Sequence, residues 1–426
     1  MPGKSITWAL YSFFLVISMC ICHQAFAGGA YLSELASPGS VGTAGVFNVV
    51  NNKTPDAVFT NPAGMTGIKN DAFMGGVQLL LPEVRFDASI ADGGGTDGDN
   101  AGVATAIPGI YGVKVLSDQW RLGMGISAPL GGGANYGRDF VGRYTATKVT
   151  LAGLSLNPAV GYRISDRVSA GIGVSLLYTT MDYQVALNQS ALAPGTPDGE
   201  VDFDGLDDWG FQGYLGLTWQ ISDRAMLGCV YRTEVESDLE GPIEFNNVQI
   251  PILNQITSQL DRAKISWDFP QLFQVGLKLN VSDKLTLLFD ADWEDWSAFS
   301  ANRFQITGGP TAVIQTIDRE FDDTWHVGAG LIYKLDKNLF SMGVGYDTSP
   351  VDDDKRTVDL PLDEQIRFGM SYGGGGEGTP FYAVGFSFIW LGKGETDQTA
   401  QGVRFKGDFD SNYILFFNGA LGFDLG

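Results

Sequence analysis

The sequence predicts an all-β protein: a transmembrane antiparallel β-barrel of about 14 strands, with an N-terminal hatch, or plug, inside its lumen. Three observations predict this fold. Long stretches alternate apolar residues with small or polar ones at a period of two, which is the pattern of strands. Glycine (57 of 426 residues) and aromatic residues (12%) are plentiful, whereas charged residues make up only 18%. Tight turns and longer loops alternate along the chain, as in bacterial outer-membrane barrels.

Residues 1–27 have the form of a secretory signal peptide. Lys4 provides the positive start, residues 8–22 are apolar, and residues 25–27 (Ala-Phe-Ala) form an A-x-A cleavage site. A retained membrane helix fits less well, because the apolar run is short and ends at that site. Cleavage removes one Lys and no acid, so the formal charge of the mature chain is 26 − 49 = −23. This acidic balance argues against nucleic acid as a partner.

Cysteine and histidine are too scarce to build disulfides or metal sites. Only Cys229 and His326 remain after cleavage, so no intramolecular disulfide can form and Cys2His2-type zinc sites are excluded. We therefore expect no metal site and no cofactor. Residues 92–100 and 352–354 offer clustered oxygens that calcium could use, but they lack EF-hand spacing and are interpreted as solvated loops.

Residues 28–69 are predicted to form a compact hatch inside a barrel made by residues 70–426. Its centre is the stretch Asn61-Pro62-Ala63-Gly64. Pro62 fixes φ and starts a turn or helix at its first position. Asn61 can cap that turn with its side-chain oxygen, and Gly64 allows close backbone packing. An ordinary capped turn is the alternative, but the long series of strands that follows favours the hatch.

Period-two alternation continues through the rest of the chain. In 168–178, 285–293 and 325–333, apolar residues alternate with residues that are mostly small or polar. Such stretches are strands, and they are long enough to cross a membrane at a tilt. By this rule the strands lie near 70–90, 106–117, 119–130, 149–164, 167–187, 206–221, 225–245, 263–281, 284–299, 321–335, 339–348, 363–373, 379–391 and 411–425.

A short turn built around aspartate recurs and divides the strands into pairs. It contains Asp118, Asp166, Asp223, Asp283 and Asp336, and aspartate suits such turns because its side chain bonds the backbone two residues on. Short turns are periplasmic in bacterial barrels and long loops are extracellular. The extracellular loops are expected near 91–105, 131–148, 188–205, 246–262, 300–320, 349–362 and 392–410.

Six short motifs, in this order and spacing, resemble the FadL-type family (OMPP1/FadL/TodX) of outer-membrane transporters for long-chain fatty acids and other hydrophobic compounds. They are residues 61–63 (NPA), 141–144 (VGRY), 156–159 (LNPA), 231–235 (YRTEV), 295–297 (DWS) and 346–351 (YDTSPV). The resemblance covers essentially the whole mature chain.

The resemblance implies passive import through a fourteen-stranded barrel in the bacterial outer membrane. Substrate is captured on an extracellular hydrophobic surface, passes to a pocket beside the hatch, and leaves sideways at a kink in the third strand. The implied partners are the lipid bilayer with its lipopolysaccharide, a hydrophobic small molecule and the barrel-assembly machinery. We expect a monomer.

The end of the third strand suits the kink that the family uses for lateral release. Pro129 removes a ladder donor, and Gly131, Gly132 and Gly133 remove side-chain packing, so pairing should break there. The start of an ordinary flexible loop is the alternative.

Two groups of apolar residues are candidates for substrate contact. Four lie at helical spacing between the seventh and eighth strands and would form a capture surface, or a helix that caps the barrel mouth: Ile252, Leu253, Ile256 and Leu260. Three near the mature N-terminus would line an apolar lumenal pocket, or pack the hatch against the wall: Tyr31, Leu32 and Leu35.

A fatty-acid carboxylate would need a basic partner, because a buried charge must be paired. The candidates are Arg143, Lys148, Lys278 and Arg319. Arg319 lies just before the tenth strand, near a basic pocket position of the family. The family's two basic positions themselves fall on Ile317 and near Gln184. This departure leaves room for neutral substrates such as aromatic hydrocarbons or alkanes.

An enzyme and a purely structural barrel are the alternatives of other classes. Asp290, Asp292 and Glu294 share one strand face, which polar lining of the lumen explains. No serine can be assigned to His326 as a catalytic partner, so we expect no enzyme. A structural or adhesive surface barrel without transport remains the second hypothesis.

Overall fold

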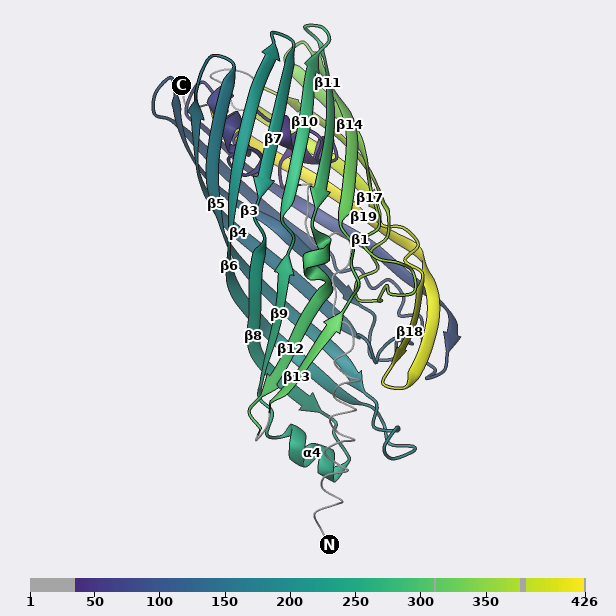
Figure 1. Ribbon diagram of the computed structural model, residues 1–426. Coiled ribbons are helices and arrows are strands. Elements are labelled where there is room, and N and C mark those ends of the chain that lie inside the picture. Colours follow the sequence, from purple (N-terminus) through teal and green to yellow (C-terminus); the bar gives the residue numbers. More distant parts are fainter. Residues whose placement is uncertain (1–34, 310–311, 376–380, 425–426) are drawn as a thin grey trace.

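The computed structural model describes residues 35–309, 312–375 and 381–424, which form a closed antiparallel β-barrel with small helices inside (Figure 1). The sheet closes because β1 (Ala72–Ala91) pairs with both β2 (Thr105–Val115) and β19 (Val403–Asp424). In these described ranges, 19 strand segments make up 14 barrel strands, since several of these strands are built from two consecutive segments. The predicted fold class is confirmed.

The barrel strands divide into continuous and interrupted ones. Besides β1, β2 and β19, the continuous strands are β3 (Trp120–Asn135), β4 (Lys148–Arg163), β5 (Val168–Leu187), β6 (Gly199–Ser222), β15 (Asn338–Asp347) and β16 (Gln365–Gly374). The interrupted strands are β7 (Ala225–Arg232) with β8 (Val235–Asn246), β9 (Arg262–Phe269) with β10 (Leu272–Asn280), β11 (Leu285–Glu294) with β12 (Ala301–Thr307), β13 (Val313–Asp318) with β14 (Thr324–Leu335), and β17 (Phe381–Trp390) with β18 (Thr396–Ala400). A 3-10 turn, η3 (Trp296–Ser300), connects β11 to β12.

Lumenal and lipid-facing side chains alternate as the sequence predicts. In β3, Leu122 and Met124 are exposed, whereas Arg121 and Gly123 face the lumen and are buried. An outward apolar face and an inward polar or small face are what a strand between lipid and lumen requires. Within the described residues, no helix combines the length and the apolar composition that a membrane-crossing helix needs.

Several strands continue beyond the ranges that the sequence predicts. β6 begins inside the expected loop 188–205, β12 and β13 occupy the expected loop 300–320, and β18 lies in 392–410. These extensions pair with one another, as Ile306 of β12 does with Val313 of β13, or with a predicted strand, as Gly199 of β6 does with Leu187 of β5. Their composition is polar, so the apolar alternation that marks a membrane strand is missing there.

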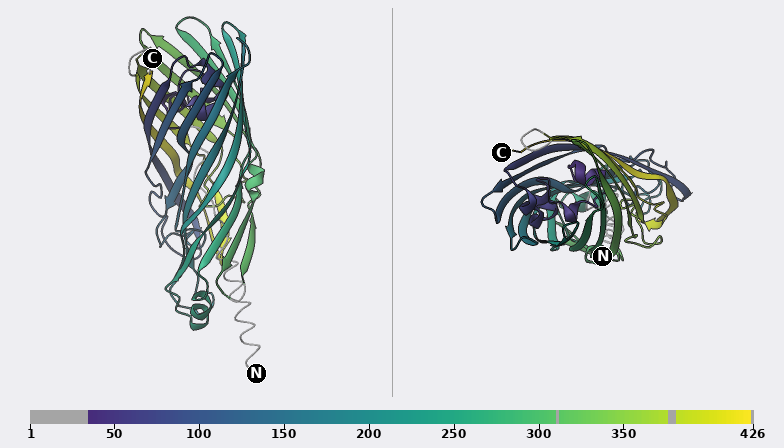
Figure 2. Two further views of the ribbon diagram at one scale, coloured as in Figure 1. Left: turned by 90° about the vertical axis from the view of Figure 1, so that its left-hand side faces the viewer. Right: turned by 90° about the horizontal axis from the view of Figure 1, so that it is seen from above.

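The hatch lies inside the lumen, near the end of the barrel where short turns join the strands (Figures 1 and 2). It consists of α2 (Pro38–Gly42), η1 (Asn48–Val50), α3 (Ala57–Thr60) and η2 (Pro62–Gly67). Small elements of this kind expose many backbone polar groups, which must find partners once they are buried.

The Asn61-Pro62 stretch caps η2 as predicted and also ties the hatch to the wall. Pro62 occupies the first turn, and Asn61 Oδ1 accepts a hydrogen bond from Ala63 N at 3.1 Å. Asn61 Nδ2 donates to Val49 O of the hatch (2.7 Å) and to Leu217 O of β6 (3.3 Å). One amide side chain therefore satisfies both the turn and the contact with the barrel.

The wall meets the hatch backbone at glycines. A Cβ at Gly228 would lie 2.2 Å from Val49 O, and a Cβ at Gly343 would lie 2.2 Å from Thr43 O. No side chain fits at such distances, so the backbones of hatch and wall are in direct contact at these positions.

Candidate functional site

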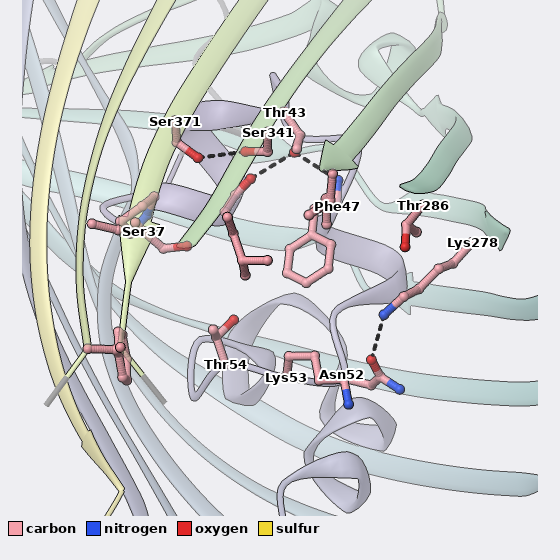
Figure 3. Close-up of a pocket in the computed structure, with 18 of the residues that line it drawn as sticks. Ser37, Thr43, Phe47, Asn52, Lys53, Thr54, Lys278, Thr286, Ser341 and Ser371 are labelled. Carbon is pink, nitrogen blue, oxygen red and sulfur yellow. Dashed lines mark hydrogen bonds between the residues drawn. The ribbon is translucent and has the colours of Figure 1, made fainter. Parts of the chain in front are cut away.

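A pocket of about 790 Å³ lies between the hatch and the barrel wall (Figure 3). Its wall residues come from strand ends beside short turns, such as Gln220 and Asp223 near the β6–β7 turn and Lys337 in the β14–β15 turn. The pocket therefore lies toward the periplasmic end. The apolar part of its lining includes Phe47, Met74, Met226, Ile332, Leu339 and Phe381.

Lys278 is a buried basic residue in the lining of this pocket. The alternation of β10 directs it inward, and its side chain is largely buried. Its Nζ donates to Asn52 Oδ1 of the hatch at 2.9 Å and lies 5.8 Å from the centre of the Phe47 ring. Among the described residues, no carboxylate forms an ion pair with it. One neutral hydrogen-bond acceptor offsets only part of the free-energy cost of removing the ammonium group from water.

Two further lysines give the pocket an excess of positive charge. Lys53 of the hatch and Lys337 of the β14–β15 turn also line it, and Asp223 contributes a carboxylate. Three ammonium groups beside one carboxylate, next to an apolar lining, suit a molecule with an anionic head and a hydrocarbon tail.

Arg143 and Lys148, by contrast, already have acidic partners. Arg143 Nε lies 2.9 Å from Asp198 Oδ2, and its guanidinium covers the Tyr144 ring at 4.5 Å. Burial, together with the hydrogen bond to Asp198, raises the pKa of Tyr144 to about 12. Lys148 pairs with Asp182 at 3.4 Å. Neither residue lines the pocket beside the hatch.

Arg319 lies in the hydrophobic core of the extracellular half rather than in the pocket. It is buried, donates to Asn302 Oδ1 and to Thr357 Oγ1, and lies 3.7 Å from Asp359 Oδ2. Burial raises the pKa of Asp359 to about 6, although the guanidinium opposes this shift. A substrate carboxylate would have to compete with Asp359 for Arg319.

The predicted capture helix exists, but most of its apolar face is covered. α4 spans Pro251–Thr257. Leu253 (1% exposed) and Leu260 (6%) belong to the extracellular core, Ile256 packs against it, and Ile252 remains 37% exposed. Three of the four residues therefore pack on the mouth of the barrel, which leaves Ile252 free for a substrate.

The N-terminal candidates are divided between described and undescribed parts of the chain. Tyr31 and Leu32 lie outside the described residues. Leu35 is buried in a cluster with Phe59, Met74, Tyr111 and Ala420. It thus packs the hatch against β1, β2 and β19, and it does not line the pocket.

The third strand is interrupted, although not at the glycines. The expectation that pairing breaks at Gly131–Gly133 is wrong: β3 runs to Asn135 and stays paired with β4 through these glycines. The register shifts between Ser127, which pairs with Ser155, and Leu130, which pairs with Gly153, so β3 carries one extra residue. The break lies at Ala128 and Pro129, because proline offers no N–H whereas glycine keeps its donor.

On the other side of β3, the pairing with β2 ends before this bulge. The β2–β3 ladder ends at Ile110 and Ile126, and the next backbone bond between the flanking segments joins Val103 N to Gly133 O at 3.3 Å. Beside this unpaired stretch lies an apolar cluster around Val41 of α2, against which Ala128 packs. The bulge thus places a gap in the ladder next to an apolar lumenal surface.

The alternation of inward and outward residues along β10 is enough to predict that Lys278 points into the lumen, because it lies on the same face of the strand as Gly276. Nothing in the sequence indicates that Lys53 and Lys337 lie near it, because the three lysines come from the hatch, a strand and a turn that are far apart along the chain.

Comparisons with known proteins agree with this architecture. A long-chain fatty acid transport protein of Salmonella typhi is 24% identical over 375 residues, which cover 83% of this chain and 85% of the relative. A crystal structure of a Pseudomonas aeruginosa FadL homologue superimposes with a TM-score of 0.84 at 19% identity, covering 93% of this chain and 100% of that one. The Pseudomonas putida toluene transporter TodX superimposes with a TM-score of 0.66 at 16% identity, covering 94% and 98%.

The family model that matches this chain does so over residues 18–419, nearly its whole length. Its members are transport channels of the outer membrane and not enzymes. Together with the plugged barrel described above, this match shows that the chain belongs to the outer membrane protein transport protein family (OMPP1/FadL/TodX).

Proposed function

We propose that this outer-membrane barrel imports long-chain fatty acids passively. The observation that carries the proposal is the pocket around Lys278, where a buried ammonium without a carboxylate partner meets an apolar lining. A fatty acid supplies both missing parts, a carboxylate for the ammonium and an acyl chain for the apolar surface. The fatty acid transport protein of Salmonella typhi is a relative that supports this substrate class.

The proposed route has three stages. Substrate first meets exposed apolar surface at the extracellular end, where Ile252 of α4 is available. It then reaches the lumen and the pocket beside the hatch. It leaves sideways through the wall at Ala128 and Pro129, where the backbone hydrogen bonds between β3 and its neighbouring strands are interrupted.

Helix α2 connects the pocket with the gap in the wall. Its Pro38 and Gly39 line the pocket, and its Val41 belongs to the apolar cluster on which Ala128 packs. A ligand that enters the pocket therefore touches the same short helix that supports the bulge. In this proposal, displacement of α2 opens the apolar path to the membrane.

Import of neutral hydrocarbons is the second candidate. It is favoured by the pairing of Arg143, Lys148 and Arg319 with acids, which leaves few free cations along the route, and by the similarity in fold to a toluene transporter. A structural or adhesive barrel is the third candidate.

The substrate is tested by uptake in cells that lack their own transporter. Wild type and Lys278→Gln are compared for a labelled long-chain fatty acid and for labelled toluene at limiting concentration. Loss of a charge-assisted hydrogen bond should weaken carboxylate binding about tenfold or more, so fatty-acid uptake should fall while toluene uptake stays unchanged. Lys284→Gln, an exposed change in the β10–β11 turn, is the matched control.

Three other results would decide against the fatty-acid proposal. Equal fatty-acid uptake by wild type and Lys278→Gln would remove the role of Lys278. Uptake of toluene alone by the wild type would favour the neutral substrate. Uptake of neither compound by correctly inserted protein would favour the structural barrel.

The lateral route is tested by deleting Ala128. The deletion removes the extra residue of β3, so the strand can pair continuously with β4, and uptake of any substrate should fall sharply. Deletion of Gly205, an exposed residue at the register irregularity between β6 and β8, is the control. Pro129→Ala restores only the missing N–H and should give an intermediate effect. Unchanged uptake by the inserted Ala128 deletion would exclude lateral release at this point.

A further inference from the structure

A row of polar side chains crosses four neighbouring strands on the lumenal side of the barrel. Gln274 of β10 pairs with Asp292 of β11, Asp292 pairs with His326 of β14, and His326 pairs with Asp347 of β15. Directly paired residues in a sheet point to the same face. The pairing therefore brings together side chains that are far apart in the sequence. Asp290 is the next lumenal residue of β11.

Three atoms in this region are close enough to share one ion. A carboxylate oxygen from each of Asp290 and Asp292 and a ring nitrogen of His326 lie within 4.8 Å of one another. The distance between Asp290 Oδ1 and His326 Nε2 is 3.6 Å. Ligands at about 2.0–2.2 Å from a metal are separated by distances of this size.

Two of these atoms are buried without a hydrogen bond. Asp290 Oδ1 and Asp292 Oδ1 have no donor among the described residues. The exposure of the Asp290 side chain is 3% and that of Asp292 as a whole residue is 7%, so bulk water does not replace the donor. Buried carboxylate oxygens that accept no hydrogen bond are costly, and both lie in the cluster with His326 Nε2.

Hydrogen bonds to other atoms of the cluster fix the orientation of two of the ligands, His326 and Asp292. His326 Nδ1 lies 3.0 Å from Asp347 Oδ1, and Arg367 Nε donates to Asp347 Oδ2 at 2.7 Å. Gln274 Nε2 donates to Asp292 Oδ2 at 2.8 Å. A histidine whose Nδ1–H is held by a carboxylate presents Nε2 as a ligand, which is the usual arrangement around protein-bound metals.

The charges also leave room for a cation. With His326 neutral, the carboxylates of Asp290, Asp292 and Asp347 face the single guanidinium of Arg367 in this cluster. A divalent ion would balance the remaining negative charge.

Glycine keeps the space between the ligands open. A Cβ at Gly328 would lie 2.3 Å from Asp290 Oδ1 and 3.0 Å from His326 Nε2, so any larger residue would fill the site. The same Cβ would lie 2.6 Å from Cγ2 of Val46, which shows that the hatch closes the site on this side.

We propose that Asp290, Asp292 and His326 bind one divalent transition-metal ion, with zinc the best fit. An imidazole with two carboxylates suits such ions, whereas magnesium and calcium prefer oxygen ligands alone. Scarce histidine and cysteine predict no metal site, but pairing across strands brings a single histidine beside two aspartates, a combination that residue counts do not reveal. The ion cross-links β11 and β14 where Val46 rests on the wall. This site is independent of the proposed transport of fatty acids.

The test uses the full barrel, purified in detergent and stripped with a chelator. Zn²⁺ is titrated by calorimetry and Co²⁺ by visible absorption, which reports four-coordinate binding. Wild type should bind a single equivalent, and Zn²⁺ should raise its melting temperature, since a ligand of the folded state stabilises it. The near-isosteric double variant Asp290→Asn/Asp292→Asn and the variant His326→Gln should lose both effects. Asp283→Asn, in the exposed β10–β11 turn, should retain them.

Two outcomes would overturn the proposal. Heat-dependent electrophoretic mobility first shows that the wild type and the double variant are both folded. If the two proteins then bind Zn²⁺ equally well, the ion binds elsewhere, and if neither binds it, there is no site. Binding of Mg²⁺ or Ca²⁺ as tight as that of Zn²⁺, unaffected by His326→Gln, would exclude a transition-metal site.

Discussion

Lys278 and Arg319 are both buried cations, and their neighbours give them different roles. Arg319 lies beside Asp359, Asn302 and Thr357, so its charge is used inside the protein. Lys278 has one amide oxygen and an aromatic ring, which leaves its ammonium available to a ligand. The sequence could name both residues as candidates. It could not separate them, because the deciding carboxylate at Asp359 is 40 residues away from Arg319 along the chain.

The stability of the extracellular core should depend on pH through Asp359. The pKa of Asp359 is about 6 in the fold and 3.8 in its reference state. A carboxyl with a raised folded pKa stabilises the fold while it is protonated, and this contribution, at most about 3 kcal/mol, is lost as the pH rises through about 6. Amides near residues 356–362 should therefore exchange with deuterium faster at about pH 7.5 than at about pH 5, after correction for intrinsic rates.

The control for this prediction is a neighbouring aspartate. Asp359→Asn should remove most of the pH dependence, whereas Asp354→Asn, an exposed change in the same loop, should leave it intact. Equal protection at both pH values in the wild type would contradict the assignment to Asp359.

For the strand β3, the sequence predicts that an interruption exists but not where it lies. Proline and glycine both weaken a strand, and the sequence places them within five residues of each other, so an interruption in this region is predictable. Its position depends on the hydrogen bonds that β4 offers. Gly131–Gly133 keep their N–H groups and pair with β4, whereas Pro129 cannot donate, and the extra residue is accommodated there.

Strands outside the membrane-facing stretches are harder to predict from the sequence. Membrane-facing stretches carry the apolar alternation and were located to within a few residues. β12, β13 and β18 pair with neighbours outside the apolar band, and their polar sequences resemble loops. These segments adopt strand structure because neighbouring strands offer them backbone hydrogen bonds, which the local sequence does not reveal.

Two adjacent residues of α4 allow its packing role and its proposed role in substrate capture to be tested separately. Leu253→Ala removes a buried side chain and should destabilise the docking of α4 by about 2–4 kcal/mol, which limited proteolysis of the loop 247–261 would detect as faster cleavage. Ile252→Ala changes an exposed residue and should leave cleavage unchanged while it lowers uptake at limiting substrate. If both variants behave alike in both assays, α4 does not divide its residues between these tasks.

At the scale of the whole molecule, the barrel is closed by its own two outermost described strands. β1 and β19 pair from Ala72 with Asp424 to Ala91 with Phe405, with two register irregularities. Closure of the sheet, the number of strands and the presence of a hatch could be predicted from the sequence. The location of the pocket could not, because it is formed where the hatch meets strands from most of the barrel circumference.

The outward residue Phe423 is predicted to assist membrane insertion. It faces lipid at the end of β19 and pairs with Phe73 across the closing seam. Phe423→Ala should reduce the amount of heat-modifiable barrel in the outer membrane, because closure loses an aromatic pair at the interface. Phe417→Ala, an outward change farther along the same strand, should have little effect. Normal insertion of Phe423→Ala would show that this aromatic residue is not needed for insertion.

The seam between β1 and β19 also sets an order of events in biogenesis. The hatch immediately precedes β1, and the partner of β1 is separated from it by almost all of the barrel sequence. Because contacts between distant segments form late, the edge of β1 that does not pair with β2 is expected to stay open until β19 arrives. We therefore expect insertion to end with closure of the ring at this seam, with the hatch already inside the growing barrel.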